Sequence, residues 1–252
     1  MKDIRNMSCR SYSYHQWDMY LKENDKHRLK IDFSSERSLS KAEKALIFPS
    51  IKAFQIGEHS DGTVLLSAVT RFSEQINEPD YNDAMVRFIK EENYHSSYLA
   101  RYMNHHKVPL AKSTFLDRVF RKIRQAGGIF FEITVLETAE IVALSYYSAL
   151  GNTAKKLGSA ALESICDQML HDELRHIVFQ SYTVSRMKYS RTKRLFRKLM
   201  MRITTDVVWI AYRDLLRAGD YSYSYFRREN LGYLKQSMYL SDLMRKDRDC
   251  SK

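Results

Sequence analysis

The sequence has very few of the residues that break helices. It contains 8 glycines and 3 prolines among 252 residues, together about 4%, where globular proteins average about 12%. Because turns depend largely on these two residue types, few turns are expected and long helices are the economical interpretation. Hydrophobic residues make up 44% of the chain, which is enough for a core and argues against global disorder.

Cysteines are also few, and their positions exclude a disulfide framework. Cys9, Cys166 and Cys250 are odd in number and show no paired spacing, which favours a reducing compartment. The N-terminal segment lacks the apolar stretch of a signal peptide. No apolar run approaches the roughly 18 residues of a transmembrane helix, so no membrane span is expected. A cytoplasmic protein is therefore predicted.

Acidic residues are outnumbered by basic ones, 30 against 41, which gives a formal net charge of +11. A basic surface of this size favours an acidic partner, such as nucleic acid, anionic lipid or an acidic protein, although it also serves solubility. The chain shows no glycine-rich nucleotide loop and no cysteine cluster. Any electrons for redox chemistry are therefore expected from a separate reductase.

Apolar periodicity divides the chain into three parts. Residues 1–49 are expected to form a polar N-terminal arm, residues 50–185 a four-helix bundle, and residues 186–252 a basic helical extension. The aromatic residues available to dock the arm are Tyr12, Tyr14, Trp17 and Tyr20. The bundle helices are expected at about 49–75, 81–106, 129–151 and 159–187, with a turn near Pro79 and a loop between Gly151 and Gly158.

A short amphipathic helix is expected at 114–126, where it would link the second and third bundle helices. One of its faces is apolar, and the other carries Arg118, Arg121, Lys122 and Arg124. This basic face, or the basic run from Arg186 to Arg202, is a candidate docking surface for an acidic carrier protein.

Two segments repeat the same spacing of a carboxylate and an imidazole. In "EENYH" (91–95) Glu92 precedes His95 by three positions, and in "DELRH" (172–176) Glu173 precedes His176 by three. On a helix such residues share a face, with Cβ atoms about 5–6 Å apart. Each pair can therefore hold a metal ion from one side, although a pair of ordinary surface residues is the alternative.

Two further glutamates complete the pattern of a carboxylate-bridged dimetal site. Such a site takes Glu-x-x-His from two helices of a bundle and one Glu from each of the other two. Glu58 precedes Glu92 by 34 positions, and Glu140 precedes Glu173 by 33. Both midpoints fall close to predicted turns, so each glutamate is expected level with its own Glu-x-x-His. The predicted ligands are Glu58, Glu92, His95, Glu140, Glu173 and His176.

Alternatives remain open for single residues. Glu137 lies one turn before Glu140 and competes with it, although the spacing favours Glu140. Glu58 is alternatively a solvated acid. Asp172 is a candidate hydrogen-bond acceptor that would fix the tautomer of a ligand histidine. Because buried carboxylates repel one another without cations, metal is expected, and an oxygen-rich donor set suits iron or manganese.

These motifs resemble those of the ferritin-like di-iron carboxylate superfamily. "EENYH", "DELRH" and "GNTA" (151–154) are similar to the soluble acyl-carrier-protein desaturases, while "GEHSDG" (57–62) followed by this arrangement resembles a set of bacterial ferritin-like proteins. The resemblance covers about residues 50–185. It implies that the six residues bind two iron ions, with manganese as the alternative.

Two positions depart from members of this superfamily. The desaturases have a threonine where this chain has Ala143, which argues against their way of handling oxygen. The related N-oxygenases have an additional histidine where this chain has Met169, which argues against an N-oxygenase site.

The function expected from the sequence is a non-haem di-iron oxidase or oxygenase within an all-α, ferritin-like bundle. Its substrate would be a small or carrier-bound organic molecule, with acyl carrier protein as a candidate partner and a ferredoxin- or flavin-type reductase as electron donor. The alternatives are a di-iron protein that handles peroxide or iron, and a metal-free basic helical module that binds RNA or protein. Nucleic acid is the less favoured partner, and a homodimer is compatible with the sequence.

Overall fold

The computed structural model describes residues 1–59, 62–110 and 128–250, and within these ranges the chain is all-α without a strand. The predicted fold class, an all-α helical bundle, is confirmed. The α-helices are α1 (Tyr14–Asn24), α2 (Lys41–Glu58), α3 (Thr63–Ile76), α4 (Asp80–His105), α6 (Ile129–Leu157), α7 (Ala160–Arg186), α8 (Arg191–Ala218) and α9 (Tyr223–Cys250). The predicted helix at 114–126, with Arg118, Arg121, Lys122 and Arg124, lies outside the described residues.

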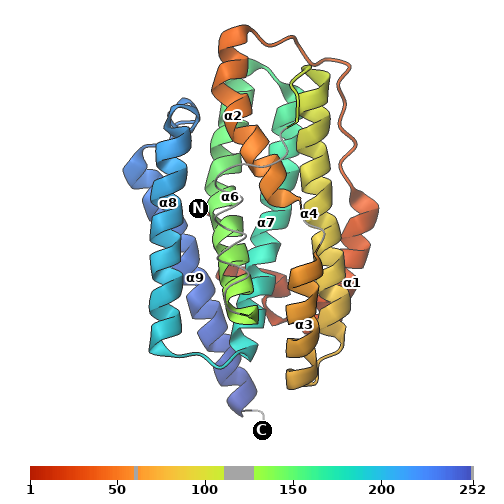
Figure 1. Ribbon diagram of the computed structural model, residues 1–252, viewed down its shortest axis with the longest axis vertical. Coiled ribbons are helices and arrows are strands. Elements are labelled where there is room, and N and C mark those ends of the chain that lie inside the picture. Colours follow the sequence, from red (N-terminus) through yellow and green to blue (C-terminus); the bar gives the residue numbers. More distant parts are fainter. Residues whose placement is uncertain (60–61, 111–127, 251–252) are drawn as a thin grey trace.

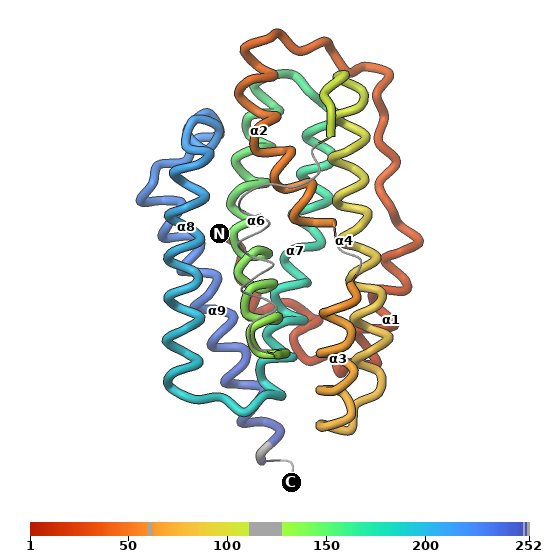
Figure 2. The backbone as a smooth tube through the Cα atoms, viewed as in Figure 1, coloured from red at the N-terminus to blue at the C-terminus, as the bar shows by residue number. Residues whose placement is uncertain are grey.

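The helices at the centre of the bundle occupy four positions around a common axis (Figure 1). Helices α6 and α7 form a long antiparallel hairpin, and α4 packs against α7. Helices α2 and α3 both pack on α4, one after the other along its length, so that together they fill the remaining position (Figure 2). Helix α1 packs on α4 from outside, while α8 and α9 cover α6 and α7 on the side away from α4.

The predicted first helix at 49–75 is wrong, because the structure has two helices there. Helix α2 ends at Glu58, and α3 begins at Thr63 after Gly62, whose φ of +73° lies in the left-handed region. Glycine enters that region readily, whereas a right-handed helix cannot continue through it. Helix α2 also begins earlier than expected, since Ser40 and Glu43 form a capping box and Pro49 lies inside the helix.

The predicted loop from Gly151 to Gly158 is too long. Helix α6 continues through Gly151 and ends at Leu157, and the next residue, Gly158, has a φ of +66°. Ser159 then caps α7, so the connection is only two residues long. A Cβ on Gly151 would lie 3.2 Å from the Cβ of Cys166, so this glycine permits the close approach of α6 and α7 rather than a turn.

The N-terminal arm is folded onto the bundle. Its helix α1 begins with a capping box between Ser13 and Gln16, and Tyr14 and Trp17 are 0% and 1% exposed. The rings of Tyr14 and Tyr81 lie 4.4 Å apart, which joins α1 to α4. The predicted docking by aromatic residues therefore holds for these two side chains.

The apolar core consists of two clusters that follow one another along the bundle. One contains Phe88 and Ile177, and the other contains Leu99 and Met169. The predicted ligands lie between these clusters, so the polar groups form a layer enclosed by apolar side chains on both sides. None of the described helices combines the length and the apolar character needed to cross a bilayer.

Close packing where α8 ends gives a first prediction. A Cβ on Gly219 would lie 2.6 Å from the carbonyl carbon and the Cα of Ala149 in α6. Because backbone atoms cannot move aside cheaply, Gly219→Ala should lower the free energy of unfolding by about 1–3 kcal/mol or more. Gly57→Ala is the control, since nothing lies within 4 Å of its Cβ position, and it should be neutral or slightly stabilising. Urea unfolding measures both, and equal effects would contradict the packing.

Candidate dimetal centre

All six predicted ligands lie in one cluster that four helices build. Glu58 is the last residue of α2, Glu140 lies in α6, and α4 and α7 each contribute a Glu-x-x-His pair. Every one of the six side chains is buried, from 0% exposure for Glu173 to 8% for Glu58. The register inferred from the two intervals therefore places these residues at one level, although the first interval crosses a helix break.

The cluster divides into two overlapping groups, each with its donor atoms within 4.8 Å of one another. The first group is Glu58, Glu92, His95 and Glu173, and the second is Glu92, Glu140, Glu173 and His176. Both groups contain Glu92 and Glu173. These two carboxylates are therefore placed to bridge two cations, while each cation would have one histidine and one further glutamate of its own.

Both imidazoles turn Nδ1 toward the shared carboxylates. The Nδ1 atom of His176 lies 3.0 Å from Glu92 Oε1, 3.1 Å from Glu173 Oε2 and 3.3 Å from Glu140 Oε2. The Nδ1 atom of His95 lies 3.4 Å from Glu173 Oε1 and 3.6 Å from Glu92 Oε1. One nitrogen of each ring thus faces the centre of the cluster.

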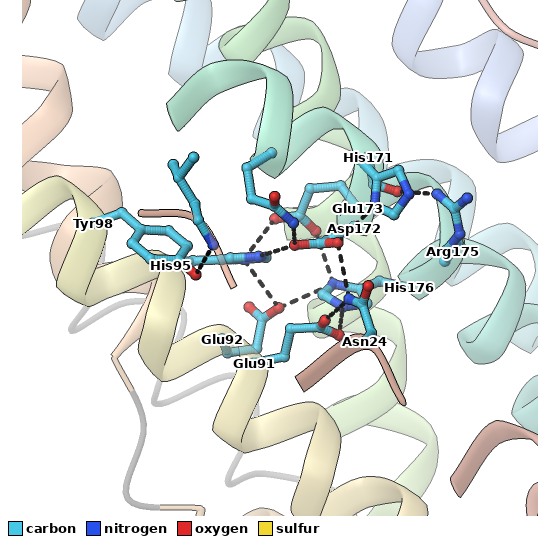
Figure 3. Close-up of polar contacts among 12 residues, drawn as sticks. Asn24, Glu91, Glu92, His95, Tyr98, His171, Asp172, Glu173, Arg175 and His176 are labelled. Carbon is cyan, nitrogen blue, oxygen red and sulfur yellow. Dashed lines mark hydrogen bonds and ion pairs between the residues drawn. The ribbon is translucent and has the colours of Figure 1, made fainter. Parts of the chain in front are cut away.

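The other ring nitrogen of each histidine contacts a carboxylate outside the cluster. His95 Nε2 lies 3.0 Å from Asp172 Oδ2, and His176 Nε2 lies 3.1 Å from Glu91 Oε2; Figure 3 marks both contacts with dashed lines. A carboxylate that accepts a hydrogen bond from Nε2 fixes the tautomer that leaves Nδ1 free to bind a metal ion. Asp172, which the sequence left as a candidate acceptor, is 3% exposed and contacts the ring of His95.

Glu91 is a site residue that the sequence analysis missed. It lies directly before Glu92, as Asp172 lies directly before Glu173, and each contacts the histidine of the other helix. The two motifs are therefore acid-Glu-x-x-His rather than Glu-x-x-His. The acidic residue directly before each ligand glutamate was the signal in the sequence that could have identified Glu91.

Several buried atoms of the cluster make no hydrogen bond of normal geometry, although some lie close to an opposite charge, and these atoms test whether the residues fit a metal. These atoms are Glu92 Oε1, His95 Nδ1, Glu140 Oε1 and Glu173 Oε1. A buried polar atom without a partner costs free energy, and such atoms in both donor groups are expected where cations complete the bonding. Carboxylate oxygen with imidazole nitrogen is a donor set that suits iron or manganese. The residues therefore fit a pair of metal ions.

The electrostatics of the cluster favour protons when metal is absent. Burial, together with the neighbouring carboxylates of Glu92 and Glu173, raises the pKa of both Glu58 and Glu140 well above its usual value. Burial alone would lower the pKa of His95 and His176, but hydrogen bonds and charges from nearby carboxylates outweigh it and raise both. The positive charge of two cations would take the place of these protons.

Glu173 and Asp172 shift in the opposite direction. Burial would raise the pKa of each, yet hydrogen bonds outweigh it and lower both. The groups that lower the pKa of Glu173 are Glu140, His176 and the nearby His95, whereas Asp172 is bonded by His171, His95 and Gln168. Both carboxylates are therefore charged at neutral pH.

The competition between Glu137 and Glu140 is resolved by their contacts. Glu140 lies in the cluster, whereas Glu137 is bound by Arg197 of α8, whose Nη2 lies 2.7 Å from both Glu137 oxygens. Arg197 belongs to the basic run from Arg186 to Arg202 and is 0% exposed. This run is therefore not a single exposed basic face.

A cavity reaches the outer side of the cluster between α1, α4 and α7. Its volume is only about 20 Å³, roughly enough for one water molecule, and its lining includes Asn24, Glu91, His95 and Asp172. Tyr147 contacts the opposite side of the site, where its hydroxyl donates a hydrogen bond of 2.6 Å to Glu58 Oε1. The six side chains are 0–8% exposed, with Glu58 the most exposed of them, so the cluster is shielded from bulk solvent on both of these sides.

Comparison of this chain with protein-family models, curated proteins and solved structures finds no significant match.

Proposed function

We propose that the chain is a ferritin-like, non-haem di-iron oxidase or oxygenase. The observation that carries the proposal is the pair of overlapping donor groups, in which Glu92 and Glu173 are common to both. When bound, two iron ions would supply the redox chemistry toward O₂. Manganese fits the same donors.

The residues of the chain have separate tasks in this proposal. Glu92 and Glu173 would be held in common by both ions, with His95 and Glu58 as further ligands of one and His176 and Glu140 as further ligands of the other. Asp172 and Glu91 hold the imidazoles by their Nε2 atoms. The apolar clusters on both sides exclude bulk water, which strengthens the electrostatic interactions within the site.

The direct test is oxygen uptake by iron-loaded protein. Anaerobic protein with two equivalents of Fe(II) is mixed with O₂ while an oxygen electrode and an absorption spectrum are recorded. Rapid uptake with a new near-ultraviolet to visible band supports the proposal. Uptake no faster than that of the same Fe(II) without protein would refute it.

A second candidate function, handling of peroxide without an organic substrate, is favoured by one observation. The cavity beside the site is lined by polar groups such as Asn24, Glu91 and Asp172, which suit a small polar oxidant better than an acyl chain. Faster oxidation of the bound Fe(II) by H₂O₂ than by O₂ selects this candidate. The substrate, an acidic carrier protein and an external reductase remain proposals with the oxygenase.

Metal binding should depend on pH because the raised pKa values leave protons on the metal-free site. Glu58, Glu140, His95 and His176 must lose these protons to bind a cation. Affinity should therefore rise with pH and fall as pH is lowered, by about tenfold per pH unit for each proton released. Mn(II) titration calorimetry in buffers of different ionisation enthalpy measures the proton release. Affinity that is flat between pH 6 and 8 would contradict the described electrostatics.

A further inference from the structure

One amide outside the bundle joins the two carboxylates that hold the histidines. Asn24, the last residue of α1, points its Nδ2 at Asp172 Oδ1, 3.2 Å away, and also donates to Glu91 Oε1. Figure 3 shows it between these two side chains. Its amide nitrogen must face them, since its oxygen would meet only acceptors.

The geometry matches the bonding capacity of each group. An amide NH₂ has two hydrogens, and each is directed to one carboxylate. Glu91 uses its remaining oxygen, Oε2, for His176, and Asp172 uses Oδ2 for His95. Asp172 also accepts a bond from Gln168 Nε2 at 2.7 Å and contacts His171 Nδ1 at 2.9 Å, whereas Asn24 is the group that links it to Glu91. The result is a continuous chain from His95 through Asp172, Asn24 and Glu91 to His176.

We propose that Asn24 is a positioning residue for both metal ions, so that helix α1 forms part of the metal centre although it lies outside the four central positions. This inference rests on the proposed function. By restraining Asp172 and Glu91 together, Asn24 fixes the orientation of both imidazoles. Loss of its amide therefore weakens the binding of both ions rather than of one.

Asn24 has an alternative role, which is merely to attach the end of α1 to the bundle. Other contacts already attach α1. Tyr14 and Trp17 are buried in the core, and Asp18 Oδ1 accepts a bond of 2.5 Å from Arg87 Nε of α4. Asp18→Asn is therefore a matched control, because it weakens the docking of α1 without touching Glu91 or Asp172.

The experiment measures Mn(II) binding to the full chain by calorimetry, with electron paramagnetic resonance to count bound ions. Asn24→Leu removes both donors, and Asn24→Asp keeps the side-chain shape but adds a third carboxylate. Both variants should bind both ions about 10–100-fold more weakly, while Asp18→Asn binds as the wild type does. Circular dichroism and melting of the metal-free proteins identify any variant that is not folded, in which case the other carries the test.

Two outcomes overturn the inference alone. Either the folded Asn24 variants bind two ions with wild-type affinity, or their affinity for Mn(II) falls no more than that of Asp18→Asn. Wild-type protein that binds no Mn(II) and no Fe(II) would instead refute the dimetal centre itself. The failure of the inference and the failure of the proposed function are thus told apart by the wild-type titration.

Discussion

Replacement of Glu173 by glutamine should abolish tight binding of both metal ions. Glu173 belongs to both donor groups and is 0% exposed, and glutamine keeps its shape while removing the bridging charge. Because substitution of groups behind the ligands already costs 10–100-fold in affinity, loss of a bridging ligand should cost more than about a hundredfold. Mn(II) calorimetry with metal analysis after gel filtration measures it.

Glu58→Gln and Glu163→Gln sharpen this prediction. Glu58 belongs to one group only, so its variant should lose one ion and keep the ion at the His176 end. Glu163 lies in α7, where its carboxylate is 3.4 Å from Lys155 and partly exposed, and its variant should bind two ions normally. A Glu173→Gln protein that retains two tightly bound ions would contradict the shared role of this residue.

Arg197→Met should lower the free energy of unfolding substantially. Arg197 and Glu137 are 0% and 1% exposed, and Arg197 also donates to Tyr189 Oη at 3.0 Å and Ser237 Oγ at 3.1 Å. Removing Arg197 leaves the buried Glu137 carboxylate with the Ser237 hydroxyl as a donor but with no positive partner, and breaking a buried pair in this way costs about 3–5 kcal/mol. Urea unfolding of metal-free protein measures this loss, which should appear as a lower midpoint.

The double variant Glu137→Met/Arg197→Met tests the cause. Removing both charges should recover much of the lost free energy, since two apolar side chains can replace a buried pair. Arg213→Ala is the surface control, because Arg213 and Asp214 are 3.9 Å apart and mostly exposed, and its effect should stay within about 0.5 kcal/mol. A double variant as unstable as the single one would show that lost packing, not charge, is responsible.

The central site could be predicted because its spacing is local. Glu92 and His95 share a helix face, as do Glu173 and His176, and a short turn fixes which residues of two adjacent helices are level. The break between α2 and α3 did not upset this register, since Glu58 ends α2 still beside α4. The asparagine in α1 could not be placed, because no periodicity relates the arm to the bundle.

The wrong predictions from the sequence concern residue types that serve more than one structural role. Gly151 was interpreted as a turn, but it lies within α6 and allows contact with Cys166. Gly62 was placed inside a helix, although its left-handed backbone separates α2 from α3. Arg197 was assigned to an exposed basic run, whereas its partner Glu137 lies 60 positions away in the sequence and on another helix. Such long-range pairs leave no periodic signal.

The most direct test of the dimetal centre is anomalous diffraction from crystals grown with Mn(II) or Fe(II), recorded on both sides of the metal absorption edge. Two anomalous peaks are predicted in the space enclosed by α2, α4, α6 and α7, one beside His95 and one beside His176, with Glu92 and Glu173 contacting both. A single peak there, no peak there, or ions bound only elsewhere on the chain would contradict the account.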